Sequence, residues 1–204
     1  IIRESKYLDR MGFPVPEAAL NVTLQEDKYH HYIMDLNIML RNYNLVINSL
    51  SPVEKELLKH KLADMQKTLK TGFTPLNWNS QRIPHFIESC NKEVEKFKSV
   101  LSEIQKNAVM IEEVVMAIQN SILVQKEDFM DDDGNANPPV DISEFYDQLE
   151  AKRVSILEVL GQKYHSIKPL LQKVEMIVAD SDKGQAPQLA SYYKYWEKRV
   201  FNAV

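Results

Sequence analysis

An acidic run, five histidines and one cysteine are the residues of this sequence that could carry chemistry. The run E-D-F-M-D-D-D-G-N-A-N-P-P-V-D occupies residues 127–141 and resembles a calcium loop in its carboxylates and its glycine. An EF-hand loop needs oxygen ligands at positions 1, 3 and 5 and glycine at position 6. Counting from Asp131 puts Ala136 at the glycine position, and placing Gly134 there puts Phe129 at position 1. Both registers fail, so the run is predicted to be a solvated loop.

The histidines and the cysteine lack the spacing of a metal site. His30 and His31 are adjacent, so from a helix they point in different directions. Three more histidines have no Cys or His partner at a metal-ligand spacing, namely His60, His85 and His165. No metal site is therefore predicted. Cys90 lies on an apolar stripe, where a small core residue is expected rather than a nucleophile.

The sequence also lacks the patterns of cofactor binding and of catalysis in a helical bundle. Its five glycines never form G-x-x-x-x-G-K or G-x-G-x-x-G, so no phosphate-binding loop is encoded. A helical enzyme with its site in the bundle core would need Glu/His pairs or Glu-x-x-His on facing apolar faces, and no such motif is present. The sequence predicts neither an enzyme nor a cofactor-binding protein.

Composition excludes several classes of partner. The net charge is −4 and the pI is about 5.8, which is not the basic footprint of a nucleic-acid-binding protein. No apolar run approaches the roughly 18 residues that a membrane span needs, so no membrane partner is expected. A single cysteine excludes a disulfide framework and favours a reducing compartment.

The elements that must position any functional residue are helices, and the longest is predicted over residues 83–126. Apolar residues recur there at alternating steps of three and four, which are consecutive heptad a and d positions. Such a helix would be roughly 65 Å long. Further apolar residues beside this seam favour a bundle over a two-stranded coil. The seam comprises Ile87, Cys90, Val94, Phe97, Leu101, Ile104, Ala108, Ile111, Val115, Ile118 and Ile122.

Helix breakers divide the chain into four segments. Residues 1–23 are interpreted as the end of a helix and a proline-containing connector, and residues 24–126 as a helical bundle segment with the long central helix. Residues 127–141 form the acidic loop, and residues 142–204 continue the helical bundle, with a kink or two abutting helices at Pro169. The predicted fold is all-α, with elongated multi-helix bundles and long heptad-patterned antiparallel helices. Both ends lie in helical patterns, so we expect a piece of a longer polypeptide.

A helix before the long one is predicted to begin at a capping box. Ser51 suits the N-cap, Pro52 suits the first helical position and Glu54 completes the box. Apolar residues at helical spacing carry this helix to Thr71.

The connector T-G-F-T-P-L-N-W-N-S-Q-R-I occupies residues 71–83 and contains one of the two tryptophans. Gly72 is suited to end the preceding helix, and Asn79 or Ser80 can cap the next one. Trp78 is expected to fold back as a hydrophobic plug. The connector is therefore predicted to be a rigid corner, with Trp78 in the structural core.

Four aromatic residues gather near the C-terminus. Leu189, Tyr193, Trp196 and Val200 share a spacing that predicts a core stripe. Tyr192 and Tyr195 would then point elsewhere, toward another bundle or toward a partner protein, where tyrosine is favoured. A thick core that buries them is the alternative, and the sequence leaves both open.

Three stretches of the sequence, in order, resemble one family. The first is M-L-R-N-Y at residues 39–43, and the last is K-V-E-M-I-V-A-D-S-D-K-G-Q-A-P-Q-L-A-S-Y-Y-K-Y-W-E-K-R-V-F-N-A-V at residues 173–204. Between them lies a pattern L-x-x-G-x-x-x-L-x-W-x-S-x-x-I, formed by Leu69, Gly72, Leu76, Trp78, Ser80 and Ile83. This set resembles the N-terminal tail, or stem, of dynein heavy chains, and the last stretch resembles axonemal outer-arm forms. Pro75 departs from the pattern, in the turn.

The resemblance implies a non-catalytic tail segment that scaffolds a microtubule motor complex. It implies binding of WD-repeat intermediate chains and light chains, pairing with another heavy chain, and docking proteins that anchor the motor to the axonemal doublet or to cargo. It implies that the motor ATPase lies elsewhere in the parent chain. The implied location is the cytoplasm and cytoskeleton, in the axoneme of a cilium or flagellum.

A standalone helical-bundle adaptor, such as a tethering or spectrin-like protein, is the alternative of a different class. It predicts an independently stable monomer. An all-helical enzyme is a third class, which the absent bundle-core motifs disfavour.

Overall fold

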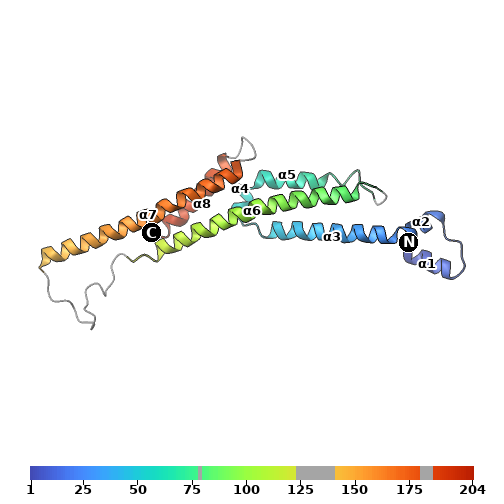
Figure 1. The fold of residues 1–204 in the computed structure, drawn as a ribbon, viewed down its shortest axis with the longest axis horizontal. Coiled ribbons are helices and arrows are strands. Elements are labelled where there is room, and N and C mark those ends of the chain that lie inside the picture. The colour runs from blue at the N-terminus through green and yellow to red at the C-terminus, as the bar shows by residue number, and fades with distance from the viewer. Residues whose placement is uncertain (78–79, 123–140, 180–185) are drawn as a thin grey trace, which may run out of the picture. The chain divides into compact units, whose positions relative to one another are not determined.

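The structure is a computed structural model, and it describes residues 1–77, 80–122, 141–179 and 186–204. Within these ranges the chain forms helices joined by turns and contains no strand, so the expected all-α class is confirmed (Figure 1). The chain divides into two compact units. The first comprises residues 1–55 and 59–99, and the second comprises residues 56–58 and 100–204.

The first unit begins with α1 (Ile2–Arg10), α2 (Glu17–Leu24) and α3 (Glu26–Asn48). The sequence predicts a connector up to residue 23, whereas a helix starts directly after Pro16. Proline lacks an N–H group, but its carbonyl accepts hydrogen bonds from the two residues that complete the next turn, at 2.9 and 3.0 Å. A proline therefore disfavours a helix before it and allows one after it.

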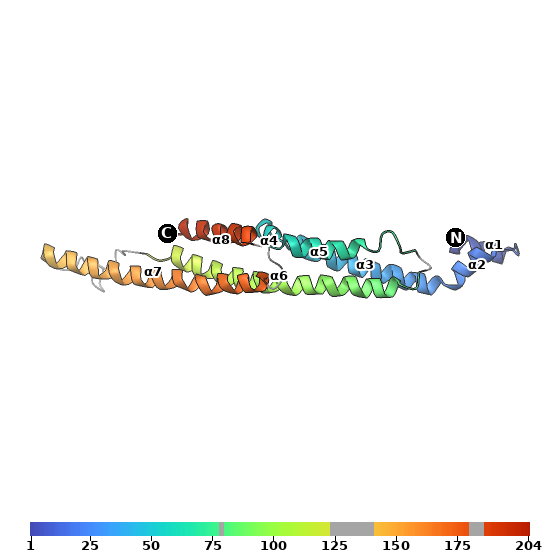
Figure 2. The ribbon, with the colours of Figure 1, turned by 90° about the horizontal axis from the view of Figure 1, so that it is seen from above.

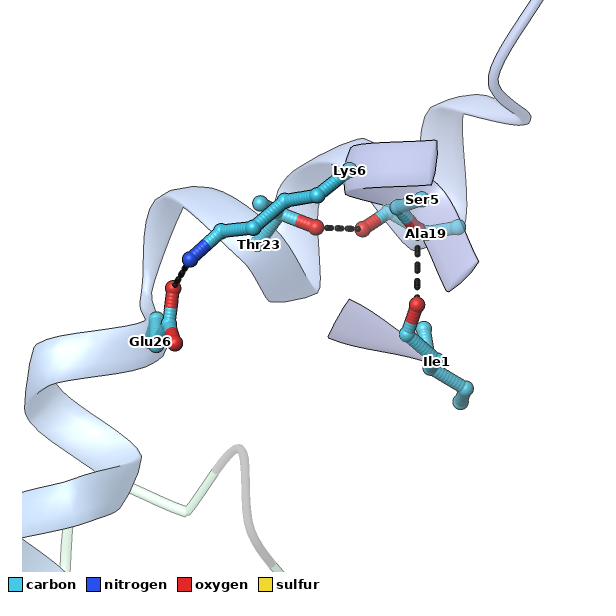
Figure 3. A network of polar contacts seen from close by, with 6 residues as sticks. All are labelled: Ile1, Ser5, Lys6, Ala19, Thr23 and Glu26. Atoms are coloured by element: carbon cyan, nitrogen blue, oxygen red, sulfur yellow. Dashed lines mark hydrogen bonds and ion pairs between the residues drawn. The ribbon is translucent and has the colours of Figure 1, made fainter. Parts of the chain in front are cut away.

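One polar contact connects α1 to α3, and two others pair side chains with the backbone of their own helix (Figure 3). The ammonium group of Lys6 in α1 pairs with the carboxylate of Glu26 in the first turn of α3. Ser5 is buried, and its hydroxyl donates to the carbonyl of Ile1 at 3.0 Å. The hydroxyl of Thr23 likewise donates to a carbonyl one turn earlier in α2, at 2.9 Å. Because Ser5 bonds within its own helix, its burial leaves no unpaired hydroxyl.

The capping box predicted before the next helix is present. The Ser51 N–H donates to Glu54 Oε2 at 2.8 Å, and the Glu54 N–H donates to Ser51 Oγ at 3.3 Å. This reciprocal pair satisfies two backbone donors at the start of α4 (Pro52–Leu57).

The helix does not run unbroken to Thr71 as predicted. It breaks at Leu58, and α5 follows over Lys59–Lys70. Leu57 and Leu58 are 2% and 1% exposed. Adjacent residues of a continuous helix point about 100° apart, so a break helps both leucines to be buried.

In the first unit, α3, α5 and the N-terminal part of α6 (Ile83–Gln119) run side by side in both views (Figure 1, Figure 2). Gln66 Nε2 of α5 donates to the hydroxyl of Tyr43 in α3 at 3.3 Å. Apolar side chains from all three helices are buried, namely Met39, Val46, Leu62, Met65, Ile83, Ile87, Cys90, Val94 and Phe97.

The turn between α5 and α6 contains Gly72, whose predicted role was to end the preceding helix. α5 does end two residues before it, but Gly72 is not in the left-handed region that a glycine cap uses. A Cβ at this position would lie 2.4 Å from Cζ of Phe86 in α6. The glycine is therefore required because an aromatic ring packs directly on its backbone. Ser80 Oγ accepts a hydrogen bond from the N–H of Arg82 at 3.3 Å, just before α6.

Trp78 and Asn79 lie outside the described residues, so the hydrophobic plug stays a prediction.

Replacing Gly72 by alanine should destabilise the first unit by about 1–3 kcal/mol, because the new methyl group overlaps the Phe86 ring. The matched control is Gly161→Ala in α7 (Ile142–Ala179), where a Cβ meets no described atom within 4 Å. That change should stabilise its helix by about 0.5–1 kcal/mol through lower backbone entropy. Urea unfolding of residues 1–204 measures both. Equal midpoints for Gly72→Ala and the unchanged chain would contradict the packing of Phe86 on this turn.

The heptad seam of α6 is buried in both units. From Ile87 to Ile118, every seam residue except Ala108 is at most 6% exposed. The helix ends at Gln119, however, and is about 55 Å long instead of reaching residue 126. Ile122 lies beyond the helix and is 59% exposed, so its place in the seam was wrong.

The end of α6 coincides with a competing side-chain bond. Ser121 Oγ donates to the carbonyl of Ala117 at 2.8 Å, and the Ser121 N–H bonds to Ile118 at 3.0 Å in a tighter turn. Serine often favours helix ends in this way, because its hydroxyl offers the backbone an alternative partner.

The second unit also contains α7 and α8 (Ala186–Phe201). α7 is continuous through Pro169, so the expectation of two abutting helices is wrong. Pro169 is exposed, where water can bond to the carbonyl that a proline leaves without its helical partner. Most of the predicted acidic loop, residues 127–140, lies outside the described residues.

Candidate interaction surface

The second unit joins α8 to the C-terminal part of α6 through an ion pair between Arg199 and Glu112. Apolar side chains from α6, α7 and α8 form the core of this unit, and the ion pair lies nearer the surface. The core residues are Leu101, Ile104, Ile111, Val115, Ile118, Ile167, Val174, Val178, Tyr192, Trp196 and Val200.

Lys163 of α7 caps the C-terminal end of α6. Its Nζ donates to the carbonyl of Ala117 and to Ser121 Oγ, at 3.0 Å each. A cation is favoured at this end of a helix, because the last carbonyls carry the negative end of the helix dipole. The contact also aligns Lys163 of α7 with the C-terminal end of α6. The residues of α7 before Lys163 therefore extend past the end of α6.

The aromatic cluster of α8 differs from the predicted stripe. Tyr192 is 2% exposed and Trp196 is 4% exposed, and their rings meet edge to face at 6.2 Å between centroids. Tyr193, which was predicted in the core, is half-buried at its edge. Tyr195 is 40% exposed and packs edge to face against Trp196 at 5.2 Å. The buried face is therefore centred on Tyr192, Trp196 and Val200, spaced by four, and of the two proposed contact tyrosines Tyr195 alone reaches the surface.

Tyr193 is held at the edge of the core by a hydrogen bond to α7. Its hydroxyl donates to Glu175 Oε2 at 3.0 Å. Partial burial of the hydroxyl, followed by this hydrogen bond and the nearby carboxylate charge, raises the pKa of Tyr193 to about 12. Each cause disfavours the phenolate, because it is less hydrated and faces a negative charge.

The raised pKa of Tyr193 predicts a loss of stability at high pH. Below pH 10 both the folded and the unfolded chain keep this proton. As the pH rises toward about 12 the unfolded chain loses it first, so the stability from Tyr193 falls across that window. In Tyr193→Phe this part of the fall should disappear, as measured by denaturant unfolding between pH 9 and pH 11. Glu175→Gln should lower the pKa of Tyr193 in a difference absorbance titration, whereas an unchanged titration would contradict the contact.

A hollow of about 270 Å³ lies between α7 and α8. Apolar side chains and four aromatic rings dominate its lining, which comprises Tyr164, His165, Ile167, Lys168, Leu171, Tyr193, Trp196, Glu197 and Val200. Tyr164 is 56% exposed at its rim, whereas Trp196 is almost fully buried. The hollow can receive an apolar side chain.

Among the described residues, Cys90 is not placed as a reactive thiol and no metal-type cluster forms. Cys90 is completely buried, and burial raises the pKa of its thiol, which disfavours the reactive thiolate. In the described part of the chain, no three His, Cys, Asp or Glu side chains gather as a metal site would require. No helix there is both long enough and apolar enough to cross a bilayer.

Two residues of α7, Gly161 and Lys163, were not among the predicted functional positions. Gly161 interrupts a helical pattern at a cost of about 1 kcal/mol relative to alanine, which makes the position worth noting in the sequence. Lys163 gave no such signal, because its partners lie more than 40 residues earlier in the chain and only packing brings them together.

Comparison with known proteins identifies relatives over the whole chain. The sequence-family model named dynein heavy chain, N-terminal region 1, matches residues 1–86. The dynein-1-alpha heavy chain of the flagellar inner arm I1 complex, from Chlamydomonas reinhardtii, is 45% identical over all 204 residues. Dynein axonemal heavy chain 10 of Homo sapiens is 37% identical over the same length. The dynein beta chain of the flagellar outer arm, from Chlamydomonas reinhardtii, is 24% identical over 188 residues, or 92% of this chain.

These relatives are far longer than this chain, which spans 4% of the length of each. The outer-arm relative is much less similar than the inner-arm one, so the outer-arm expectation is not supported.

Proposed function

Because this chain belongs to the axonemal dynein heavy chains and forms part of their N-terminal tail, we propose that it is a scaffold segment of a microtubule motor complex. The segment itself is non-catalytic, and the motor ATPase lies elsewhere in the parent heavy chain. The protein is located in the axoneme of a cilium or flagellum.

One observation carries this proposal. The likeness to the inner-arm I1 heavy chain extends over all 204 residues of a chain whose described part is helical. Long helices with continuous buried seams hold their shape over tens of ångströms, as an assembly scaffold requires.

The same likeness supports an inner-arm heavy chain of the I1 alpha type. The identity of 45% to that relative, against 24% to the outer-arm beta chain, favours this type over the outer-arm one. The standalone adaptor suggested as an alternative has no support among these relatives.

The partners of the scaffold would be WD-repeat intermediate chains, light chains, another heavy chain and docking proteins. Tyr195 is our candidate contact residue for one of them, because it is a large, half-apolar side chain left 40% exposed beside a rigid core.

The test uses the complete heavy chain in a flagellated cell. In Tyr195→Ala, the amount of intermediate or light chain per heavy chain in extracted dynein should fall, while ATPase activity per heavy chain is unchanged. Quantitative mass spectrometry of the subunits measures the first and phosphate release measures the second. The matched control is Met176→Ala, which removes another exposed apolar side chain, 73% exposed, from α7 of the same unit. Lower ATPase activity with normal subunit amounts would refute the scaffold role.

A further inference from the structure

In the part of the chain that the structure describes, several large apolar side chains of the N-terminal half of α7 are exposed. Lys163 lies at the end of α6, so residues 142–162 extend past that helix for about 30 Å. The buried residues of α7 are Ile167, Val174 and Val178, all after this stretch. Large apolar side chains before them are exposed, namely Ile142, Phe145, Tyr146, Val154, Leu157 and Val159.

Some of the exposed residues of α7 form a stripe with the spacing of a helix-packing face. Val154, Leu157, Gly161 and Tyr164 follow one another at steps of three, four and three, so they share one side of α7. The three large side chains are 45%, 49% and 56% exposed. A continuous apolar stripe of this kind on a soluble helix marks an interaction site.

Gly161 adds an independent observation. It lies inside a 38-residue helix, where glycine is less stable than alanine, and no described atom lies within 4 Å of the position of a Cβ. Gly72 shows the opposite case, since a ring of this chain fills the space beside it. Within the described chain nothing requires glycine at position 161. A bare backbone at the centre of an apolar stripe is suited to the close passage of another helix.

The stripe leads into the hollow between α7 and α8, because Tyr164 belongs to both. The lining of the hollow includes Trp196, which is 4% exposed. A helix that follows the stripe can therefore place one side chain in the hollow beyond its closest approach at Gly161.

We propose that a helix from another part of the same heavy chain crosses α7 at Gly161 and inserts an apolar side chain into the hollow between α7 and α8. Two observations identify this occupant. The packing face continues the bundle of the second unit at the point where α6 ends, and relatives aligned over the whole chain are about 25 times longer, which leaves most of the heavy chain to supply such a helix. The inference rests on the proposed scaffold role.

The test is photo-crosslinking in the intact dynein complex. Two variants of the heavy chain are prepared. In one, a benzophenone amino acid replaces Leu157 on the stripe, and in the other it replaces Val159. The two positions are matched, because they are 49% and 47% exposed on the same helix and point about 160° apart. The probe at position 157 should crosslink to a peptide of the same heavy chain outside residues 1–204. The yield of this crosslink should be at least tenfold higher than that from the probe at position 159. Adding Gly161→Leu to the variant with the probe at position 157 should reduce its crosslink yield at least fivefold, because the leucine side chain blocks the close approach of the other helix.

Three results would overturn the inference: a Leu157 crosslink to a different subunit, equal crosslinks from both positions, or none from either. The first would leave the scaffold role intact with a different occupant. Failure of the scaffold role itself would appear in the Tyr195→Ala experiment, as lost ATPase activity with normal subunit amounts, and is therefore distinguishable. In the isolated chain, Gly161→Ala should raise the melting temperature, which separates a docking requirement from a folding one.

Discussion

Replacing Ile104 by aspartate should unfold the second unit of the chain. Ile104 is 0% exposed at the centre of the α6 seam, so the carboxylate would enter an apolar core without a partner. The group must either remain charged there or bind a proton far above its usual pKa, and either route is costly. We expect a loss of about 4–5 kcal/mol or more, against a typical domain stability of about 5–15 kcal/mol. Circular dichroism during heating measures the loss of helix.

Val109→Asp is the control for this prediction. Val109 lies five residues later in the same helix but is 58% exposed, so its carboxylate stays in water. The melting temperature of this variant should stay within a few degrees of the unchanged chain, since surface substitutions usually change stability by about 0.5 kcal/mol or less. Similar melting curves for the Ile104 and Val109 variants would refute the seam assignment.

Replacing Tyr192 by alanine should produce the second large effect. Its ring is 2% exposed and packs edge to face against Trp196, so the change leaves a cavity in the α8 core. Removal of a buried aromatic side chain typically costs about 3–5 kcal/mol. Denaturant unfolding should show a lower midpoint with an unchanged slope, as expected when stability alone is reduced.

Tyr195→Ala is the control for Tyr192→Ala, and it separates the effect of burying a tyrosine from the effect of its contact with the Trp196 ring. Tyr195 also meets the Trp196 ring, at 5.2 Å, but is 40% exposed. Its loss should cost about 0.5–1.5 kcal/mol, the usual contribution of an aromatic pair. If Tyr195→Ala proved as destabilising as Tyr192→Ala, both tyrosines would belong to the core and the proposed contact role of Tyr195 would fail.

Features that depend on neighbours in the sequence could be predicted. The capping box of Ser51 and Glu54 forms as expected, because both partners lie within one turn of the chain. The α6 seam is buried from Ile87 to Ile118, because a period of 3.5 residues keeps these side chains on one side whatever packs against them. The helix after Pro16 was missed, because the effect of a proline depends on which side of it the chain continues.

Features that depend on distant contacts could not be predicted. Neighbouring tyrosines in an amphipathic helix offer two nearly equivalent core stripes, and packing against α6 and α7 selects Tyr192 over Tyr193. The end of α6 depends in the same way on Ser121 and on Lys163. The reason for Gly72 is an aromatic ring fourteen residues later, which no local pattern indicates.

The sequence by itself therefore determined that this chain is helical, where its main seam lies, and that it resembles a dynein tail, since periodicity and ordered motifs are properties of the chain. Only the tertiary structure decided which aromatic residues are buried, where α6 stops, and which apolar side chains of α7 are exposed among the described residues. These outcomes depend on side chains far apart in the sequence competing for the same space, and that competition is settled when the helices pack.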